Sequence, residues 1–515
     1  MDNSLWIEFK KGKDYPKLEG KTKSEICIIG GGLTGLTLAY YLTKEGKEVT
    51  LIEKDKICSH TSGNTTAKIT SQHGLFYNYL LQSVGKKEAK QYLDANEKAI
   101  SDIKKIIEEE NIECNFKEKN AYVFTQKQEE VNKIKKEVEA LEYLGYKSEF
   151  LENLELPIKD KNKESTEDSI SIQKKILGAI CFKNQAQFNP ILYGQALADK
   201  IVENGGKIYE NSKVIDIKKE KESYKVITEN GEVNSQIIVL ATHYPIISSP
   251  GFYFMKMYQE TSYLIAAETK EPLFNGMYIT SEEPTISLRT AKLGDKEVFL
   301  VGGMSHKTGA KIDLKNSYKI LEDVAKQLYP DCKILYRWNT EDCIPLDKIP
   351  YIGEFSNLWP NAYVATGYKK WGMTSSNVAA NIIKDKILGK VNEYEEVFKS
   401  TRLKPIKNYE ELGNMLKEVS YSAVINKLKK IEEYVKDVKQ KEGKIVEIEG
   451  KKVGVYRDEK GKVYLVKPYC THLGCELSWN NLDNTWDCPC HGSRFTFEGK
   501  SIYDPSIKDL EVFEE

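Results

Sequence analysis

The stretch "EICIIGGGLTGLTLAYYLTKEGKEVTLIE", residues 25–53, decides the fold. "ICII" near its start is an apolar run of the length of a buried strand, and "VTLIE" at its end reads as a second strand. Between them, "LTGLTLAYYLTKE" carries apolar residues at helical spacing, and Gly46 is a typical helix stop. The stretch therefore predicts a strand–helix–strand unit with a glycine turn between the first strand and the helix.

Three glycines in this turn, Gly30, Gly32 and Gly35, form a G-x-G-x-x-G pattern. Such glycines permit a tight turn, close approach of the backbone to a pyrophosphate, and close packing of helix on strand. Glu53 ends the second strand 23 residues after Gly30, where an acid can bind a ribose hydroxyl. We expect a dinucleotide site here. The alternative is a glycine-rich turn in an ordinary α/β domain.

Later blocks of sequence indicate which dinucleotide is bound. A helix pattern begins with "NP" at Asn189, the strand "IIVLATH" follows, and "DKIPYIG" precedes "ATGYKKWGMT". With the glycine turn, these blocks resemble the glycine oxidase and D-amino-acid dehydrogenase superfamily, flavoenzymes of the D-amino-acid oxidase fold, over about residues 25–390. The resemblance implies an α/β FAD-binding domain of the Rossmann type with an α+β substrate domain.

The resemblance also implies which residues contact FAD. They lie in the glycine turn, after the second strand, in the loop 59–68 and in the two later strand ends. The expected FAD contacts are Gly30, Gly32, Leu33, Thr34, Gly35, Glu53, Lys54, Thr65, Thr66, Val214, Ala241, Thr242, Gly367, Trp371, Gly372, Met373 and Thr374. Some relatives attach the flavin covalently through Cys or His. Cys343 and His60 have suggestive positions, but a plain loop residue is the preferred interpretation of each.

The substrate site is less marked in the sequence. Only five of the 76 basic residues are arginine, and Arg289 is the only one among the first 300 residues. We therefore expect Arg289 to bind a substrate carboxylate, with a structural ion pair as the alternative. Tyr263, His306 and Lys369 are the other catalytic candidates. For His306 a loop or core position is the favoured alternative.

The C-terminal part holds "CTHLGC" at 470–475 and "CPCHGS" at 488–493, which together contain four cysteines and two histidines. The spacing C-x-H-x15-C-x-x-H could place one Cys and one His on each of two loops. Two cysteines and two histidines could also bind zinc. However, C-x-H is shorter than the usual step of a zinc finger.

The two motifs closely resemble the Rieske family over about residues 443–515. That resemblance implies a [2Fe-2S] cluster with Cys470 and Cys488 on one iron and His472 and His491 on the other. It also implies a disulfide between Cys475 and Cys490 that ties the two loops together.

Two positions near these motifs bear on the redox potential. High-potential members of the Rieske family place a hydroxyl where this chain has Ser493, and a tyrosine where it has Phe495. Since Phe495 lacks the hydroxyl that would bond to a ligand cysteine, we expect a potential below the high end of the Rieske range.

We expect three regions in the chain. Residues 1–391 form the FAD-dependent oxidoreductase, residues 392–440 a helical linker, and residues 441–515 a small all-β Rieske domain. Within the first, FAD-binding segments at about 22–84, 186–246 and 345–391 alternate with substrate or cap segments at about 85–185 and 247–344. Residues 85–150 are charged and expected to be largely helical.

Composition restricts the partners. The formal net charge is −1 without a dominant basic block, which argues against nucleic acid. No apolar stretch is long enough for a signal peptide or a transmembrane segment, so we expect a cytoplasmic protein. The expected partners are a small amine or amino acid and a one-electron acceptor or donor, either a protein or a quinone-like molecule.

Three functions fit the sequence. The first is a dehydrogenase that oxidises a C–N bond by hydride transfer to FAD and passes single electrons through the Rieske cluster to an external acceptor. The second is a reductase that runs electrons from a donor protein through the cluster to FAD and substrate. In the third, the Rieske domain is a redox sensor or a docking module.

Overall fold

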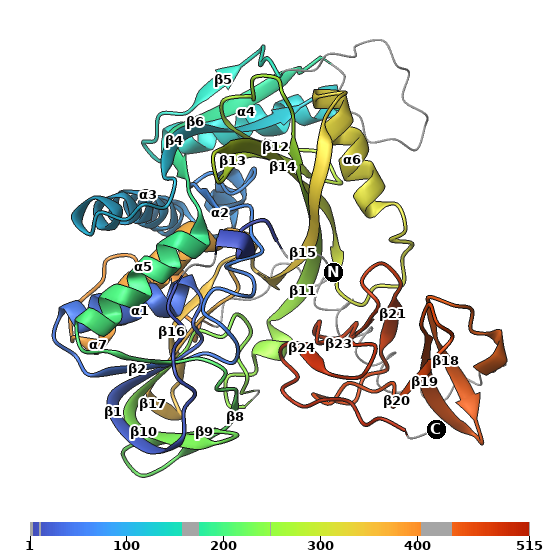
Figure 1. The fold of residues 1–515 in the computed structure, drawn as a ribbon. Coiled ribbons are helices and arrows are strands. Elements are labelled where there is room, and N and C mark those ends of the chain that lie inside the picture. The colour runs from blue at the N-terminus through green and yellow to red at the C-terminus, as the bar shows by residue number, and fades with distance from the viewer. Residues whose placement is uncertain are drawn as a thin grey trace.

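Four sheets organise the chain in the computed structural model, which describes residues 4–9, 12–156, 172, 175–247, 249–402 and 435–513. Two large sheets form the N-terminal part, and two small antiparallel sheets form the C-terminal part (Figure 1). The C-terminal part lies against the long strands β11 (Met257–Glu268) and β15 (Lys333–Pro345) of the second sheet.

The first sheet has eight strands, six of them in the order β16-β17-β10-β1-β2-β7. The five strands from β17 to β7 are parallel neighbours, while β16, β8 and β9 pair antiparallel. The bounds are β1 (Gly20–Ile29), β2 (Val49–Ile52), β7 (Lys207–Tyr209), β8 (Val214–Lys219), β9 (Tyr224–Thr228), β10 (Gly231–Leu240), β16 (Tyr351–Ser356) and β17 (Trp359–Thr366).

The predicted strand–helix–strand unit is confirmed as β1, α1 (Leu33–Lys44) and β2. All four residues of β2 are buried, as expected for a central parallel strand covered on both faces. Helix α1 ends as predicted at Gly46, whose φ of 77° lets the backbone close the last turn. The helix predicted after "NP" is α5 (Pro190–Glu203), capped by the Asn189 side chain, which accepts hydrogen bonds from the amides of Ile191 and Leu192.

The second sheet has nine strands, eight of them in the order β15-β11-β14-β13-β12-β4-β6-β3. The strand β5 pairs with β6 beside this path. The bounds of the remaining strands are β3 (Lys68–Ile69), β4 (Lys117–Thr125), β5 (Glu149–Leu151), β6 (Gly178–Gln187), β12 (Met277–Thr280), β13 (Ile286–Leu293) and β14 (Lys296–Lys307).

Helices cover both sheets. The long charged pattern at 85–150 forms α3 and α4, but β4 lies between them, so the expectation of a largely helical segment missed a strand. β4 is polar in its first half and mostly buried in its second half, and it pairs with β6 and β12 inside the sheet. The remaining helices are α2 (Tyr77–Val84), α3 (Lys86–Glu109), α4 (Gln128–Tyr143), α6 (Ser317–Leu328), α7 (Gly372–Ile387), α8 (Glu395–Phe398), and the short 3-10 turns η1 (Ile7–Phe9), η2 (Tyr253–Met255) and η4 (Val435–Asp437).

The C-terminal part is all-β, as predicted. One small sheet is β18-β19-β20 and the other is β21-β22-β23-β24. Their bounds are β18 (Glu442–Ile448), β19 (Lys451–Arg457), β20 (Val463–Val466), β21 (Ser478–Asn480), β22 (Thr485–Asp487), β23 (Arg494–Thr496) and β24 (Ser501–Tyr503). Of the expected linker 392–440, residues 403–434 lie outside the described residues.

None of the helices in the described part of the chain has the length and the apolar character that a membrane span requires.

Candidate functional site

The glycine turn after β1 packs against the end of β10. Gly30 has a φ of +112°, and a Cβ there would lie only 2.3 Å from the carbonyl oxygen of Ala241. A Cβ at Gly35 would lie 2.0 Å from the oxygen of Gly30. Larger residues would therefore push the turn away from both the strand and the helix. The first turn of α1 is thereby held at the carboxyl ends of the parallel strands.

Glu53, the residue directly after β2, fixes the same turn. Its carboxylate accepts one hydrogen bond from the amide of Gly31 (2.7 Å) and another from the amide of Asp55 (2.9 Å). The side chain is buried at 7% exposure. An acid, a glycine turn and a helix N-terminus thus meet at one point, which is the donor set that a dinucleotide requires.

A cavity of about 540 Å3 opens at this point. Most of the residues expected to contact FAD line it. They are Gly30, Gly32, Leu33, Thr34, Glu53, Lys54, Thr65, Thr66, Val214, Ala241, Thr242, Trp371, Gly372 and Met373. Because the cavity collects these side chains from distant segments, the residues present fit FAD.

Three of the expected FAD contacts lie just behind the cavity lining. Gly35 packs on Gly30 inside the turn, and Gly367 turns the chain with a φ of +78° beside Pro345. Thr374, in the first turn of α7, is buried, and its hydroxyl lies 3.3 Å from the carbonyl oxygen of Thr70. These residues shape the wall rather than form its surface.

Arg289 is not among the lining residues of this cavity. It is 2% exposed, and its guanidinium donates to the backbone oxygens of Thr66 (2.6 Å), Ala67 (2.7 Å) and Thr290 (2.9 Å). Burial lowers its pKa to about 9. Arg289 therefore ties the loop 59–68 to β13. This placement favours a structural function for Arg289 over the expected contact with a substrate carboxylate. The alternative of a structural ion pair is also not what is seen, because the partners of Arg289 are backbone carbonyl oxygens.

Tyr263 and His306 stack on each other, with ring centroids 5.7 Å apart. Tyr263 contributes to the cavity lining, whereas His306 does not. His306 instead lines a second cavity between the loop 309–314 and the C-terminal domain. Burial lowers the pKa of His306, so it is neutral at physiological pH. The pair therefore belongs to the interface between the sheet and the C-terminal domain.

Lys369, one of the catalytic candidates, lies in the lining of the first cavity. Its ammonium stands over the ring of Phe76 at 3.8 Å. Burial, then the charges of Lys348 and Lys370, lower its pKa to about 7. Its backbone is left-handed (φ 49°), as is that of Lys370 (φ 72°). Non-glycine residues held in this region often mark functional sites.

Two cavity residues were not among the predicted sites. Lys68 donates to the oxygen of Tyr278 (2.9 Å) and to the hydroxyl of Ser287 (2.6 Å), and burial lowers its pKa to about 7. His73 stacks on Trp371 at 4.8 Å, and burial lowers its pKa to about 3. Neither residue stands in a motif of recognisable spacing. The only sequence signal for Lys68 is its place at the end of the loop 59–68.

The two positions considered for covalent flavin attachment differ in the structure. His60 lines the cavity and its Nε2 lies 2.6 Å from a carboxylate oxygen of Asp55. Cys343 is buried outside the lining, and its thiol donates to the carbonyl oxygen of His243 at 3.5 Å.

The two cysteine loops of the C-terminal domain have the same local geometry. In each, the glycine four residues after the first cysteine donates its amide to that cysteine's oxygen: Gly474 to Cys470 (2.8 Å) and Gly492 to Cys488 (2.9 Å). The expected disulfide between Cys475 and Cys490 is formed and joins the loops. The loops thus present their side chains toward each other.

The four expected metal ligands converge between these loops. Cys470 and Cys488 are buried, and the rings of His472 and His491 lie 5.2 Å apart. The Nδ1 atom of His491 is buried and has no hydrogen-bond partner among the described residues. Two thiols and two imidazoles in this arrangement fit a [2Fe-2S] cluster with mixed ligands.

The cluster loops contact the flavin domain directly. The side-chain amide of Gln259 on β11 donates to the carbonyl oxygen of His491 at 3.0 Å and to that of Asp504 at 2.6 Å. A Cβ at Gly492 would lie 2.5 Å from the Cβ of Gln259, and one at Gly309 would lie 2.5 Å from the amide nitrogen of Pro489. At these two glycines the domains therefore approach too closely for a side chain to fit between them.

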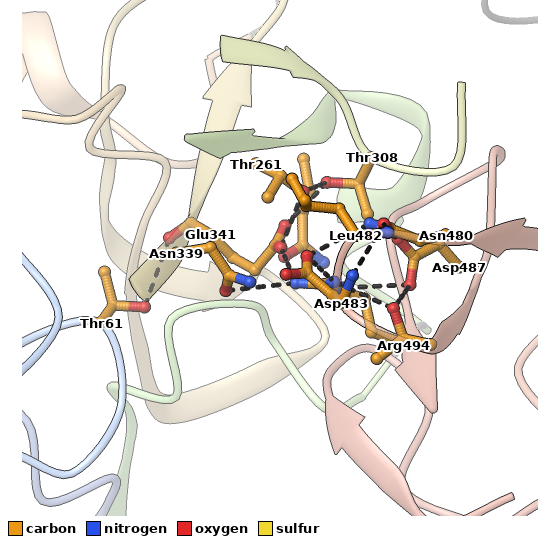
Figure 2. A network of polar contacts seen from close by, with 12 residues as sticks. Thr61, Thr261, Thr308, Asn339, Glu341, Asn480, Leu482, Asp483, Asp487 and Arg494 are labelled. Atoms are coloured by element: carbon orange, nitrogen blue, oxygen red, sulfur yellow. Dashed lines mark hydrogen bonds and ion pairs between the residues drawn. The ribbon is translucent and has the colours of Figure 1, made fainter. Parts of the chain in front are cut away.

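A buried ion network stabilises this contact (Figure 2). Arg494 of β23 bonds to Glu341 of β15 at 2.8 Å, to Asp483 at 2.7 Å and to Asp487 at 3.0 Å. Thr261 and Thr308 donate to the two oxygens of Glu341. Burial raises the pKa of Glu341 to about 7, while Arg494 opposes that rise. A single arginine thus joins the C-terminal domain to the second sheet.

Two family models match the chain. The model of the FAD dependent oxidoreductase family matches residues 25–386, and that of the Rieske [2Fe-2S] domain matches residues 430–514. The second match decides between the zinc and iron–sulfur interpretations of the four ligands in favour of a [2Fe-2S] cluster.

Known proteins share both the sequence and the fold. The YhfW protein of Bacillus subtilis (strain 168), whose name describes it as a Rieske 2Fe-2S iron-sulfur protein, is 38% identical over 96% of this chain and 94% of its own length. L-proline dehydrogenase from P. horikoshii has a TM-score of 0.61 at 21% identity, covering 75% of this chain and 98% of its own. Glycine oxidase from Geobacillus kaustophilus has a TM-score of 0.60 at 19% identity, covering 74% and 100%.

Proposed function

Because the chain belongs to the FAD dependent oxidoreductase family and carries a C-terminal Rieske [2Fe-2S] domain, we propose that it oxidises a small amino acid or amine at a C–N bond and passes the electrons singly to an external acceptor. When bound, FAD supplies a hydride acceptor and the cluster a one-electron carrier. The chain's own residues would bind the substrate, hold the two centres apart at a fixed separation and exclude water.

One observation carries this proposal: the paired strands β11 and β15, a single layer of the second sheet, lie between the cavity and the Rieske domain. On β11, Tyr258 and Glu260 line the cavity, while Gln259 between them contacts His491. On β15, Asp342 lines the cavity, while its neighbour Glu341 bonds to Arg494. Successive strand residues point to opposite faces, so β11 contacts both the cavity and a cluster loop, and β15 contacts both the cavity and Arg494 of the Rieske domain.

This contact favours electron transfer between flavin and cluster while the Rieske domain stays docked on β11 and β15. The ion network is fully buried, and its pair between Arg494 and Glu341 crosses from the Rieske domain to β15, so undocking would leave the Glu341 carboxylate without its cation. A Rieske domain that swings freely, or one that only senses redox state at a distance, would not need such a contact. The dehydrogenase and the reductase directions both remain compatible with it.

Lys369 supports an amino acid over a simple amine. Its side chain is partly buried in the cavity wall, and no ion pair to it occurs among the described residues. Lys348 and Lys370 add positive charge nearby and help to lower its pKa. A substrate carboxylate beside Lys369 would offset the cost of burying this cation. We assign the carboxylate contact to Lys369, in place of Arg289.

The fold neighbours guide the choice of substrates to test. Two of these neighbours are named L-proline dehydrogenase and glycine oxidase. The purified holoenzyme would be mixed under anaerobic conditions with glycine, with L-proline and with D-alanine, and with putrescine as an amine that has no carboxylate. The proposal predicts loss of the oxidised flavin absorbance with an amino acid and not with putrescine.

The same experiment separates the other two functions. If no amino acid or amine bleaches the flavin, while a reduced ferredoxin reduces first the cluster and then the flavin, the protein is a reductase. If the flavin and the cluster never exchange electrons in either direction, the Rieske domain acts as a sensor or a docking module.

A further inference from the structure

The cavity assigned to FAD has a wall that comes from the Rieske domain. Three lining residues, Tyr503, Asp504 and Ile507, lie in the segment 503–507, which begins at the last residue of β24. The other lining residues all belong to the flavin domain. Nothing in the glycine-turn pattern or in the cysteine motifs indicates that the two sites share a wall.

Lys54 and His60, both lining residues on the flavin side, contact this segment. The ammonium of Lys54 donates to the carbonyl oxygen of Ile502 at 3.1 Å and lies 4.0 Å from the carboxylate of Asp504. The ring of His60 meets that of Tyr503 edge to face, with centroids 6.0 Å apart. The segment therefore touches the part of the cavity that follows Glu53, where the sequence places the ribose and pyrophosphate contacts.

The segment is also tied to both cluster loops. The amide of Ser506 donates to the hydroxyl of Ser493 at 3.0 Å, and the Ser506 hydroxyl bonds to that of Thr471. Thr471 lies in the first cluster loop and Ser493 in the second. Gln259 adds its hydrogen bond to the oxygen of Asp504. One short segment thus connects the cavity wall to the loops that carry the metal ligands.

Packing between two domains needs only buried contacts at their boundary. Here three residues of the Rieske domain also form part of the surface of the cavity assigned to FAD. Tyr503 is buried at 9% exposure, and its ring lies 5.9 Å from the guanidinium carbon of Arg494 in the ion network. The same docking that forms the network therefore positions the wall.

We propose that the segment 503–507 of the Rieske domain is part of the FAD-binding site, so that FAD binding and docking of the Rieske domain stabilise each other. This inference rests on the assignment of the cavity to FAD. The coupling is reciprocal by thermodynamic linkage: if the docked domain slows the loss of FAD, then bound FAD must favour the docked domain. The flavin is retained only while the cluster is held at its working position.

Hydrogen–deuterium exchange on the full chain tests the coupling without any substrate. The protein would be compared with its cluster intact, before and after removal of FAD. We expect removal of FAD to speed amide exchange in peptides covering 501–507 as well as in those covering 30–35 and 59–66. Faster exchange at 30–35 and 59–66 with no change at 501–507 would overturn the proposal. No change at 30–35 would instead overturn the assignment of the cavity to FAD.

A pair of Rieske-domain variants gives the second test. Ile507→Ala removes part of the cavity wall, whereas Val512→Ala changes a residue that is 58% exposed and lies outside the lining. The rate of FAD release would be followed by the recovery of free-flavin fluorescence after dilution. We expect Ile507→Ala to speed release about threefold or more, because apolar contact with the cofactor is lost, and Val512→Ala to leave it unchanged. Equal release rates in wild type and Ile507→Ala, with the cluster absorbance intact in both, would contradict the proposal.

Discussion

The side-chain amide of Gln259 donates a hydrogen bond to the backbone oxygen of His491 at 3.0 Å, which joins a strand that lines the proposed FAD cavity to an expected ligand of the iron–sulfur cluster. Gln259 lies between two cavity-lining residues on β11, so the path from cavity to cluster crosses a single strand. This contact holds the second cluster loop at a fixed position relative to the cavity.

Gly492 allows the contact. A Cβ there would lie 2.5 Å from the Cβ of Gln259, so Gly492→Ala would force the second cluster loop away from β11. We expect intramolecular electron transfer between flavin and cluster to slow in this variant. Stopped-flow absorbance under anaerobic conditions measures the rate.

Gly461→Ala is the matched control for Gly492→Ala. Both glycines have positive φ, +85° and +81°, so both substitutions carry a backbone cost of about 1 kcal/mol. A Cβ at Gly461 would have only the far end of Gln440 nearby, at 3.9 Å. If the two variants slow electron transfer equally, the effect comes from backbone strain and not from the domain contact.

Arg494 is expected to stabilise the Rieske domain through Asp483 and Asp487 and its contact with β15 through Glu341. Arg494→Met would leave Glu341, Asp483 and Asp487 buried without a cation, at a cost of about 3–5 kcal/mol. The comparison is Arg337→Met, since the Arg337 pair with Glu322 is half exposed and such pairs contribute about 0–1 kcal/mol. Thermal unfolding followed by cluster absorbance should show a much larger loss for Arg494→Met; similar losses would disprove the importance of the network.

Lys369 predicts a pH dependence of substrate binding. Its pKa of about 7 means that the ammonium is protonated below pH 7 and loses its charge above it. The KM for an amino acid should therefore rise as pH increases through this value. Lys369→Met should raise KM about tenfold at pH 6, the effect of losing one charged hydrogen bond, and leave kcat largely unchanged.

Lys369→Arg provides the control for that profile, because an arginine keeps its charge at every pH used. Its KM should vary less between pH 6 and 9 than that of the wild type. A KM profile that is the same in wild type, Lys369→Met and Lys369→Arg would remove Lys369 from the substrate site.

Phe495 is predicted to lower the potential of the cluster relative to a tyrosine. It is fully buried and packs in the same apolar group as Cys470 and Cys488. Phe495→Tyr should raise the midpoint potential, because a hydroxyl bonded to a ligand sulfur stabilises the reduced state. Phe497→Tyr is the control, since Phe497 packs on Tyr456 and Tyr464 instead. A redox titration that finds no rise in Phe495→Tyr contradicts this explanation.

The sequence predicted those parts of the fold that have a local pattern. The strand–helix–strand unit, the glycine turn and the two cysteine loops each follow from spacing within a few residues. The disulfide and the four convergent ligands were inferred from the Rieske motifs. Such features depend on residues close together in the chain, so their pattern can be recognised in a single sequence.

The parts that the sequence did not predict depend on contacts between distant segments. Arg289 could not be told apart from a substrate ligand, because its partners are backbone oxygens of a loop about 220 positions away. His306 looks the same in sequence whether it faces the flavin or the Rieske domain. The wall at Tyr503 depends on how the two domains dock, and no local pattern in the sequence contains that arrangement.

The most direct test of the central claim is the rate at which the cluster is reduced after an amino acid has reduced the flavin. Rapid-freeze electron paramagnetic resonance would follow the cluster in anaerobic holoenzyme at several protein concentrations. If the two sites exchange electrons across β11 and β15, the cluster is reduced in a first-order step whose rate does not depend on protein concentration. A cluster that stays oxidised beside a reduced flavin, or a rate that scales with protein concentration, would contradict this.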